Sequence, residues 1–155
     1  MRVQDIMNRK VETVSPEDGV VFANELMWRR CIHHLVVVEG DRVVGVLSDT
    51  DLGGPNAPEI SDSQRIRDVM TADPVTVAPA VTVDRAVNIL WERGIHCLPV
   101  LDGQRLVGIV TSTDIENLAK RGTSNRRYAG TDAQPYPPMN NLRGKSADRA
   151  GHDNL

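Results

Sequence analysis

The sequence predicts an α/β (α+β) protein with two tandem β-α-β-β-α repeats packed about a pseudo-twofold axis, plus a largely irregular C-terminal tail. Residues 3–52 align without a gap on residues 66–115, and 19 of the 50 aligned pairs are identical. Within each copy, β-branched runs alternate with apolar residues at helical spacing. A unit of about 50 residues buries too little surface to be stable alone. We therefore expect the two units to pair.

Each copy is expected to begin with a short strand. The runs VETV at 11–14 and VTV at 75–77 are rich in β-branched residues, which favour strands. Pro16 and Pro79 follow them and end the pairing, because proline has no backbone N–H to donate.

A helix is expected next in each copy. Val20, Ala23 and Met27 recur at i, i+3 and i+7, the spacing of one buried helix face. Thr82 is a good N-cap for the second helix, whereas Gly19 is a weaker cap for the first. The equivalent buried positions in the second copy are Val83, Ala86 and Leu90.

A hairpin and a second helix are expected to complete each copy. Two apolar runs flank Gly40 in the first copy and Gly103 in the second, which indicates a glycine-containing turn between strands. The helix after Asp114 is expected to end near Gly122 as a C-terminal cap. In the first copy, Gly53-Gly54-Pro55 is expected to cut the helix short.

The chain is therefore divided into two repeats, a linker and a tail. The tail contains no Val, Ile or Phe and holds several Pro, Gly and Asn, a composition that cannot build a core. We expect a flexible, solvated tail, with docking through Tyr128 or Tyr136 as the alternative. The predicted boundaries are 1–54 for the first repeat, 55–65 for the linker, 66–121 for the second repeat and 122–155 for the tail.

The composition argues against several classes of function. The net charge is -3 and the basic residues are dispersed, so we expect no nucleic-acid partner. No stretch approaches the roughly 18 apolar residues of a membrane span, and no signal-peptide core is visible, which favours a cytoplasmic protein. Cys31 and Cys97 lack metal-binding spacing. No catalytic motif is present, so we expect no enzyme, no catalytic residue and no required cofactor.

Polar residues at the end of each hairpin form the first candidate site. Ser48, Thr50 and Asp51 recur in the second copy as Thr111, Thr113 and Asp114. A carboxylate there can accept two hydrogen bonds from a ribose diol, and the hydroxyls can donate to phosphate. Plain helix capping is the alternative explanation.

Histidines form the second candidate site. His33 and His96 occupy equivalent positions directly before the central strand, and His34 follows the first of them. Protonated or hydrogen-bonded imidazoles could contact phosphate oxygens. A metal site at these three residues is the alternative, but no carboxylate or thiol spacing supports it.

These motifs together resemble the cystathionine-β-synthase (CBS) domain, usually found in pairs, over residues 3–118. The resemblance rests on the Asp-x-Met start, Thr-Val-x-Pro, Ile-x-x-Leu-Pro-Val, Val-Gly-Ile-Val and the closing Thr-x-x-Asp. It implies a disc-like module with two clefts between paired sheets. Such clefts commonly hold AMP, ADP, ATP or S-adenosylmethionine as regulatory ligands.

The resemblance also implies which residues line each cleft, because the Thr-x-x-Asp of one copy usually faces the other copy. It places Asp51 and Asp114 on ribose hydroxyls, and the other hydroxyls and His residues on phosphate. His34 stands where the γ subunit of AMP-activated kinase has an arginine, and Cys97 stands there in the second copy. One cleft would use Ser48, Thr50, Asp51, Val75, Ile95 and His96. The other would use Thr111, Thr113, Asp114, Thr13, Ile32, His33 and His34.

Two functions are compatible with these residues. The first is a regulatory module that senses an adenosine-containing molecule, works as a homodimer and controls an unidentified protein. The second is a structural dimerisation or adaptor protein without a ligand. The missing arginine and the shortened first helix favour the second.

Overall fold

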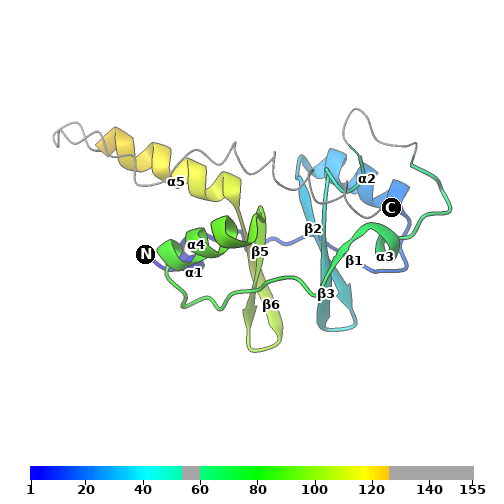
Figure 1. The fold of residues 1–155 in the computed structure, drawn as a ribbon, viewed down its shortest axis with the longest axis horizontal. Coiled ribbons are helices and arrows are strands. Elements are labelled where there is room, and N and C mark those ends of the chain that lie inside the picture. The colour runs from blue at the N-terminus through cyan, green and yellow to red at the C-terminus, as the bar shows by residue number, and fades with distance from the viewer. Residues whose placement is uncertain (54–59, 126–155) are drawn as a thin grey trace, which may run out of the picture.

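The computed structural model describes residues 1–53 and 60–125. Together these residues form two halves that lie side by side (Figure 1). Each half contains a helix followed by a β-hairpin, and the elements of one half recur 63 residues later in the other. The predicted repeat and the α/β class are thus confirmed. The equivalent elements are α2 (Val20–Arg30) and α4 (Val83–Arg93), β2 (His34–Glu39) and β5 (Cys97–Asp102), and β3 (Arg42–Ser48) and β6 (Arg105–Thr111).

The two hairpins have the same register. His34 pairs with Ser48 in the first, and Cys97 pairs with Thr111 in the second. Each pairing shifts by one residue at the equivalent place, directly after Val37 and Val100. The turns contain Gly40 and Gly103 with φ of 61° and 63°, a conformation that glycine adopts without steric cost. The predicted hairpins are confirmed.

The helices α2 and α4 bury the predicted faces. Val20, Ala23 and Met27 are buried, as are their equivalents in α4. The Oγ1 of Thr82 accepts a hydrogen bond from the Arg85 N–H at 3.3 Å, whereas Gly19 offers no side-chain cap. The prediction of unequal caps is confirmed.

The predicted first strand forms in only one copy. In the first copy, β1 (Thr13–Val14) pairs in parallel with β2, and the Val36 N–H donates to Glu12 O at 3.2 Å. In the second copy, the expected strand at 75–77 is reduced to a single bridge between Val77 and Val100. The reason is local: Pro99 stands at the position of Val36 and has no N–H to donate.

The final helix also differs from the prediction. The helix α5 (Ser112–Asn125) continues through Gly122, so the expected cap at Gly122 is wrong. In the first copy, residues 49–52 form only a turn before Gly53, and the helix is cut short as expected. No helix of the described residues is both long and apolar enough to cross a membrane. The linker residues 54–59 and the tail from residue 126, with Tyr128 and Tyr136, lie outside the described residues.

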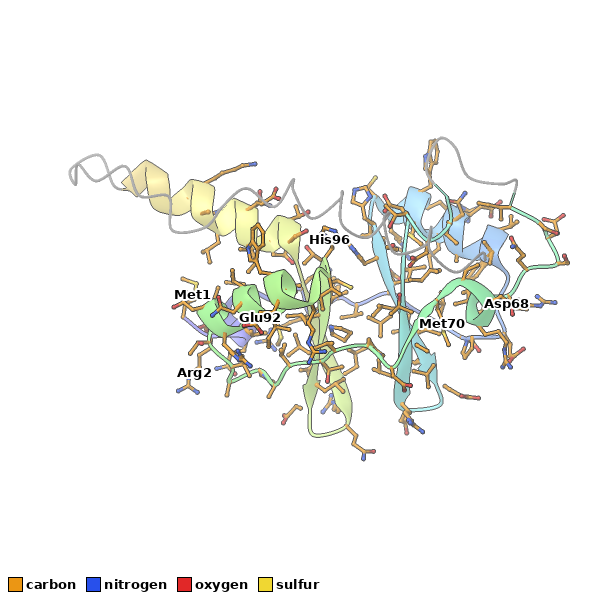
Figure 2. The ribbon with its side chains drawn as sticks, viewed as in Figure 1. Met1, Arg2, Asp68, Met70, Glu92 and His96 are labelled. Atoms are coloured by element: carbon orange, nitrogen blue, oxygen red, sulfur yellow. The ribbon has the colours of Figure 1, made fainter. Side chains whose placement is uncertain are left out.

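The segment at the start of each repeat packs on the other half, which the sequence did not predict. The helix α1 (Val3–Ile6) lies beside α4, and Figure 2 places Met1 and Arg2 there. The Val3 N–H donates to Val81 O at 2.8 Å, and the Val83 N–H donates to Met1 O at 3.0 Å.

The equivalent segment of the second repeat completes the first half. The helix α3 (Ile66–Val69) begins where the Ile66 N–H donates to Asp18 O at 2.9 Å. The strand β4 (Thr71–Ala72) then pairs antiparallel with β3. Each half is therefore built from both repeats.

The core is aliphatic and divides into three clusters. One lies within each half, and the third lies between the two sheets. Val36, Cys97 and Ile109 form the buried part of this third cluster, so both hairpins contribute to the seam between the halves. The packing brings the ends of the hairpins of both repeats together.

Candidate functional site

The turn after β3 is held by reciprocal hydrogen bonds between Ser48 and Asp51. The Ser48 N–H donates to Asp51 Oδ2 at 2.8 Å, and the Asp51 N–H donates to Ser48 Oγ at 3.3 Å. Ser48 Oγ also lies 2.7 Å from Thr50 Oγ1. These side chains therefore fix the turn, as the capping interpretation requires.

The turn after β6 is held in the same way by Thr111 and Asp114. Asp114 Oδ2 accepts from the Thr111 N–H at 2.8 Å and from Thr111 Oγ1 at 3.0 Å. Among residues 1–53 and 60–125, no hydrogen bond to Oδ1 of Asp114 is present. One carboxylate oxygen thus caps the helix and the other is available to a ligand.

Each turn is joined to the loop before the central strand of its own repeat. The Asp49 N–H donates to His33 O at 3.0 Å, and the Ser112 N–H donates to His96 O at 2.8 Å. His33 Nδ1 also lies 2.8 Å from Asp49 Oδ2. Figure 2 shows His96 at the end of β5 nearest α5. The histidines and the polar turns therefore lie at one end of the hairpins.

A cavity of about 210 Å³ lies between the two repeats. The end of β6 and the start of α5 form one wall, and the loop before β2 forms another. Of the residues expected in this cleft, it brings together Thr111, Thr113, Asp114, Ile32, His33 and His34.

The remaining predicted residue of this cleft, Thr13, is not among the cavity lining. Thr13 lies on β1 with its side chain exposed, while its neighbour Val14 is buried in the core of the first half. The chain instead reaches the cavity one to three residues earlier. The lining residues that the sequence did not predict are Asn8, Lys10, Val11, Glu12, Cys31 and Ile109.

Nothing in the sequence pattern could have identified this stretch. It becomes part of the wall because residues 1–8 cross to the second half, where Asn8 forms a bridge with Ile109. Glu12 is held in place by an ion pair with Arg30, with a nitrogen–oxygen distance of 3.4 Å.

The second predicted set occupies the pseudo-equivalent positions around Asp51. Asp51 and Thr50 are exposed, whereas Ser48, Val75, Ile95 and His96 are half-buried. Burial, together with the nearby Asp51 carboxylate, raises the pKa of Cys97 to about 12. Asp51 of the first repeat therefore lies near the central strand of the second repeat.

Asp114 of the second repeat has the equivalent relationship with His34 of the first repeat. Burial lowers the pKa of His34 to about 4, while the carboxylates of Asp49 and Asp114 oppose the shift. Asp114 of the second repeat thus lies near the central strand of the first. At neutral pH, His34 is uncharged and can offer one hydrogen bond, but no positive charge.

The described residues also limit the chemistry of the site. Within residues 1–53 and 60–125, no three His, Cys, Asp or Glu side chains are grouped so that they could hold a metal ion. The cavity has polar groups from two turns, an apolar wall and no cluster of catalytic carboxylates along its lining.

A family model described as "CBS domain" matches residues 3–52 and 66–120. The chain belongs to the CBS domain family. These CBS domains are 31% identical over 114 residues to the CBS domain-containing protein YhcV of Bacillus subtilis, covering 73% of this chain and 81% of YhcV. The crystal structure of the CBS domain pair of MJ0100, in complex with 5′-methylthioadenosine and S-adenosyl-L-methionine, superposes with a TM-score of 0.71. It is 27% identical and covers 79% of this chain and 98% of that one.

CBS domains of this kind are also found within larger enzymes. The inosine-5′-monophosphate dehydrogenase of Korarchaeum cryptofilum is 33% identical over 141 residues, which cover 87% of this chain but only 29% of the enzyme. The chain therefore spans less than a third of the length of that relative.

Proposed function

We propose that the paired CBS domains form a regulatory module that senses an adenosine-containing molecule in clefts between the repeats. The observation that carries this proposal is the cavity beside Asp114, which both repeats line. The related CBS pair of MJ0100 in complex with 5′-methylthioadenosine and S-adenosyl-L-methionine supports the ligand class.

The cavity offers complementary chemistry for a nucleoside. The Oδ1 of Asp114, which has no hydrogen bond from the described residues, accepts hydrogen bonds from ribose hydroxyls. The side chains of Val11, Ile32 and Ile109 provide an apolar surface for a base. The volume of about 210 Å³ is below the roughly 300–1,000 Å³ of drug-sized sites, which favours a nucleoside or a mononucleotide.

Regulation follows from the position of the cavity between the halves. A ligand that contacts both repeats stabilises the arrangement in which both walls are in place. The module would then change its packing against a partner, a second copy or an unidentified regulated protein, without catalysing a reaction. The ligand acts as an effector in this proposal, so no cofactor is required.

Isothermal titration with AMP, ADP, ATP and S-adenosylmethionine tests the proposal. We expect at least one of them to bind, and Asp114→Ala to abolish binding in the described cavity. Asp51→Ala is the matched control, because it removes the equivalent carboxylate from the opposite side of the module. Failure of all four compounds to bind the wild-type protein would refute ligand sensing.

A dimerisation or adaptor role is the second candidate, and one observation favours it. Trp28 on α2 is 86% exposed and Phe22 is 52% exposed, whereas Trp91, the equivalent of Trp28, packs against the core of the second half. Large exposed aromatic side chains are typical of protein contacts. Light scattering of the wild-type protein and Trp28→Ser tests this role. A dimer that Trp28→Ser dissociates, in a protein that binds no adenosine compound, would support it.

A further inference from the structure

The cavity beside Asp114 and the pseudo-equivalent side of the module beside Asp51 carry opposite charges at one pair of equivalent positions. Lys10 lines the cavity beside Asp114. The residue 63 positions later is Asp73. Because the starting segment of each repeat packs on the other half, both residues lie next to the hairpin of the other repeat. Lys10 lies two residues after the bridge between Asn8 and Ile109, and Asp73 lies two residues after Thr71, which pairs with Val46.

Lys10 is the cation that this cavity offers to a ligand. Within the described part of the chain, its ammonium group has no ion-pair partner. Of the two carboxylates of the wall, Glu12 pairs with Arg30, and Asp114 accepts from Thr111 through Oδ2 and keeps its negative charge for the ribose side of a ligand. His34 lines the same cavity half-buried and uncharged.

The opposite side of the module has the reverse arrangement. Asp73 has a fixed backbone, since its N–H donates to Val44 O at 3.1 Å and its φ is 49°. Asp51 adds a carboxylate on the turn after β3, whereas the Asp49 carboxylate lies 2.8 Å from His33 of the first cavity. Val75 stands at the position equivalent to Glu12. Arg93 is the equivalent of Arg30, and Arg30 does not line the cavity.

We propose that the two clefts select ligands of different charge. The cleft beside Asp114 takes a nucleoside with an anionic group, such as a phosphate, which Lys10 contacts. The cleft beside Asp51 takes an uncharged or cationic nucleoside, because Asp73 repels an anion. This inference rests on the proposed function and adds the charge of the ligand in each cleft.

The physical basis is the difference between a salt-bridged and a repelled phosphate. Hydrogen bonds from an ammonium group to an anionic oxygen are roughly twice as strong as neutral ones. A carboxylate in the same place removes this attraction and adds repulsion. Lys10 is exposed, so its contribution is reduced by salt.

Titration with adenosine and AMP tests the selection. We expect one AMP per chain, a loss of about tenfold in AMP affinity in Lys10→Met, and a change of less than about twofold for adenosine. Arg9→Met is the matched control, because it removes an adjacent exposed cation that bonds Gln4 O and does not line the cavity. It should leave both affinities unchanged. Asp73→Lys should create a second AMP site.

Several outcomes would overturn the inference. Equal filling of two AMP sites in the wild-type protein would contradict it, as would an unchanged ratio of AMP to adenosine affinity in Lys10→Met. An AMP stoichiometry that stays at one in Asp73→Lys would remove the role of Asp73. Binding of neither compound would refute this inference, whereas the proposed function would fail only if ADP, ATP and S-adenosylmethionine also did not bind.

Discussion

Gly45 lies so close to Met70 that a Cβ atom on the glycine would be 2.7 Å from the methionine sulfur. Gly108 and Met7 have the same relationship in the other half, at 2.5 Å. In both pairs, the methionine comes from the segment that starts the other repeat (Figure 2 labels Met70). The glycine of the Val-Gly-Ile-Val signature therefore makes room for the exchanged segment.

We predict that Gly45→Ala lowers the free energy of unfolding by about 2 kcal/mol, because the new methyl group overpacks this contact. The Thr71 carbonyl oxygen, 2.9 Å from the same Cβ position, leaves little freedom to relax. Urea unfolding measures the effect. The control is Gly122→Ala in α5, where nothing lies within 4 Å. It should stabilise the protein by up to about 1 kcal/mol. Equal stabilities of the two variants would contradict the close packing.

We predict that deletion of residues 1–7 mainly weakens the second half. Val3 and Met7 are buried in the core cluster of that half, with Leu90 and Leu98. Hydrogen exchange followed by mass spectrometry should therefore find greater loss of protection in β5 and β6 than in β2 and β3.

The opposite variant provides the control for this exchange of segments. Ile66 is fully buried in the cluster of the first half, with Leu35 and Leu47. Ile66→Ala should cost about 2–5 kcal/mol and deprotect β2 and β3 first. The exchanged arrangement would be refuted if each change acted chiefly on the half that follows it directly in sequence.

We predict that the two cysteines differ sharply in reactivity. Cys97 is buried and its pKa is raised to about 12, so its thiol stays protonated and inaccessible. Cys31 is exposed and lines the cavity. A thiol reagent at pH 8 should modify one cysteine per native chain and two after denaturation. A ligand in the cavity should slow the reaction of Cys31, and an unchanged rate with bound ligand would place that ligand elsewhere.

We predict that the protein loses stability as the pH falls from 6.5 to 4. The folded-state pKa of His34 is lowered from 6.5 to about 4, so the unfolded chain takes up a proton first. This contribution is complete above pH 6.5 and is lost as the pH falls toward 4. For His34 alone, the loss between pH 7 and pH 5 is on the order of 2 kcal/mol. Urea unfolding of His34→Gln at both pH values should give a smaller difference than the wild type. The same difference in both proteins would rule out His34 as its source.

The duplication made most of the fold predictable. Each helix and hairpin of one copy supports the assignment of the other, since Thr82 and Gly103 repeat the roles expected of Gly19 and Gly40. Two errors had local causes. Pro99 removes a donor from the first strand pairing of the second copy, and Gly122 is tolerated inside α5 because glycine costs a helix only about 1 kcal/mol.

The sequence by itself determined the repeat, the hairpins and the polar turns that contain Asp51 and Asp114, because these depend on spacing within about 50 residues. Only the tertiary structure decided which repeat supplies each wall of the cavity, and that residues 8–12 rather than Thr13 reach it. The physical reason is that each starting segment buries its apolar residues in the other half. Local periodicity records that a residue is buried but not which core receives it.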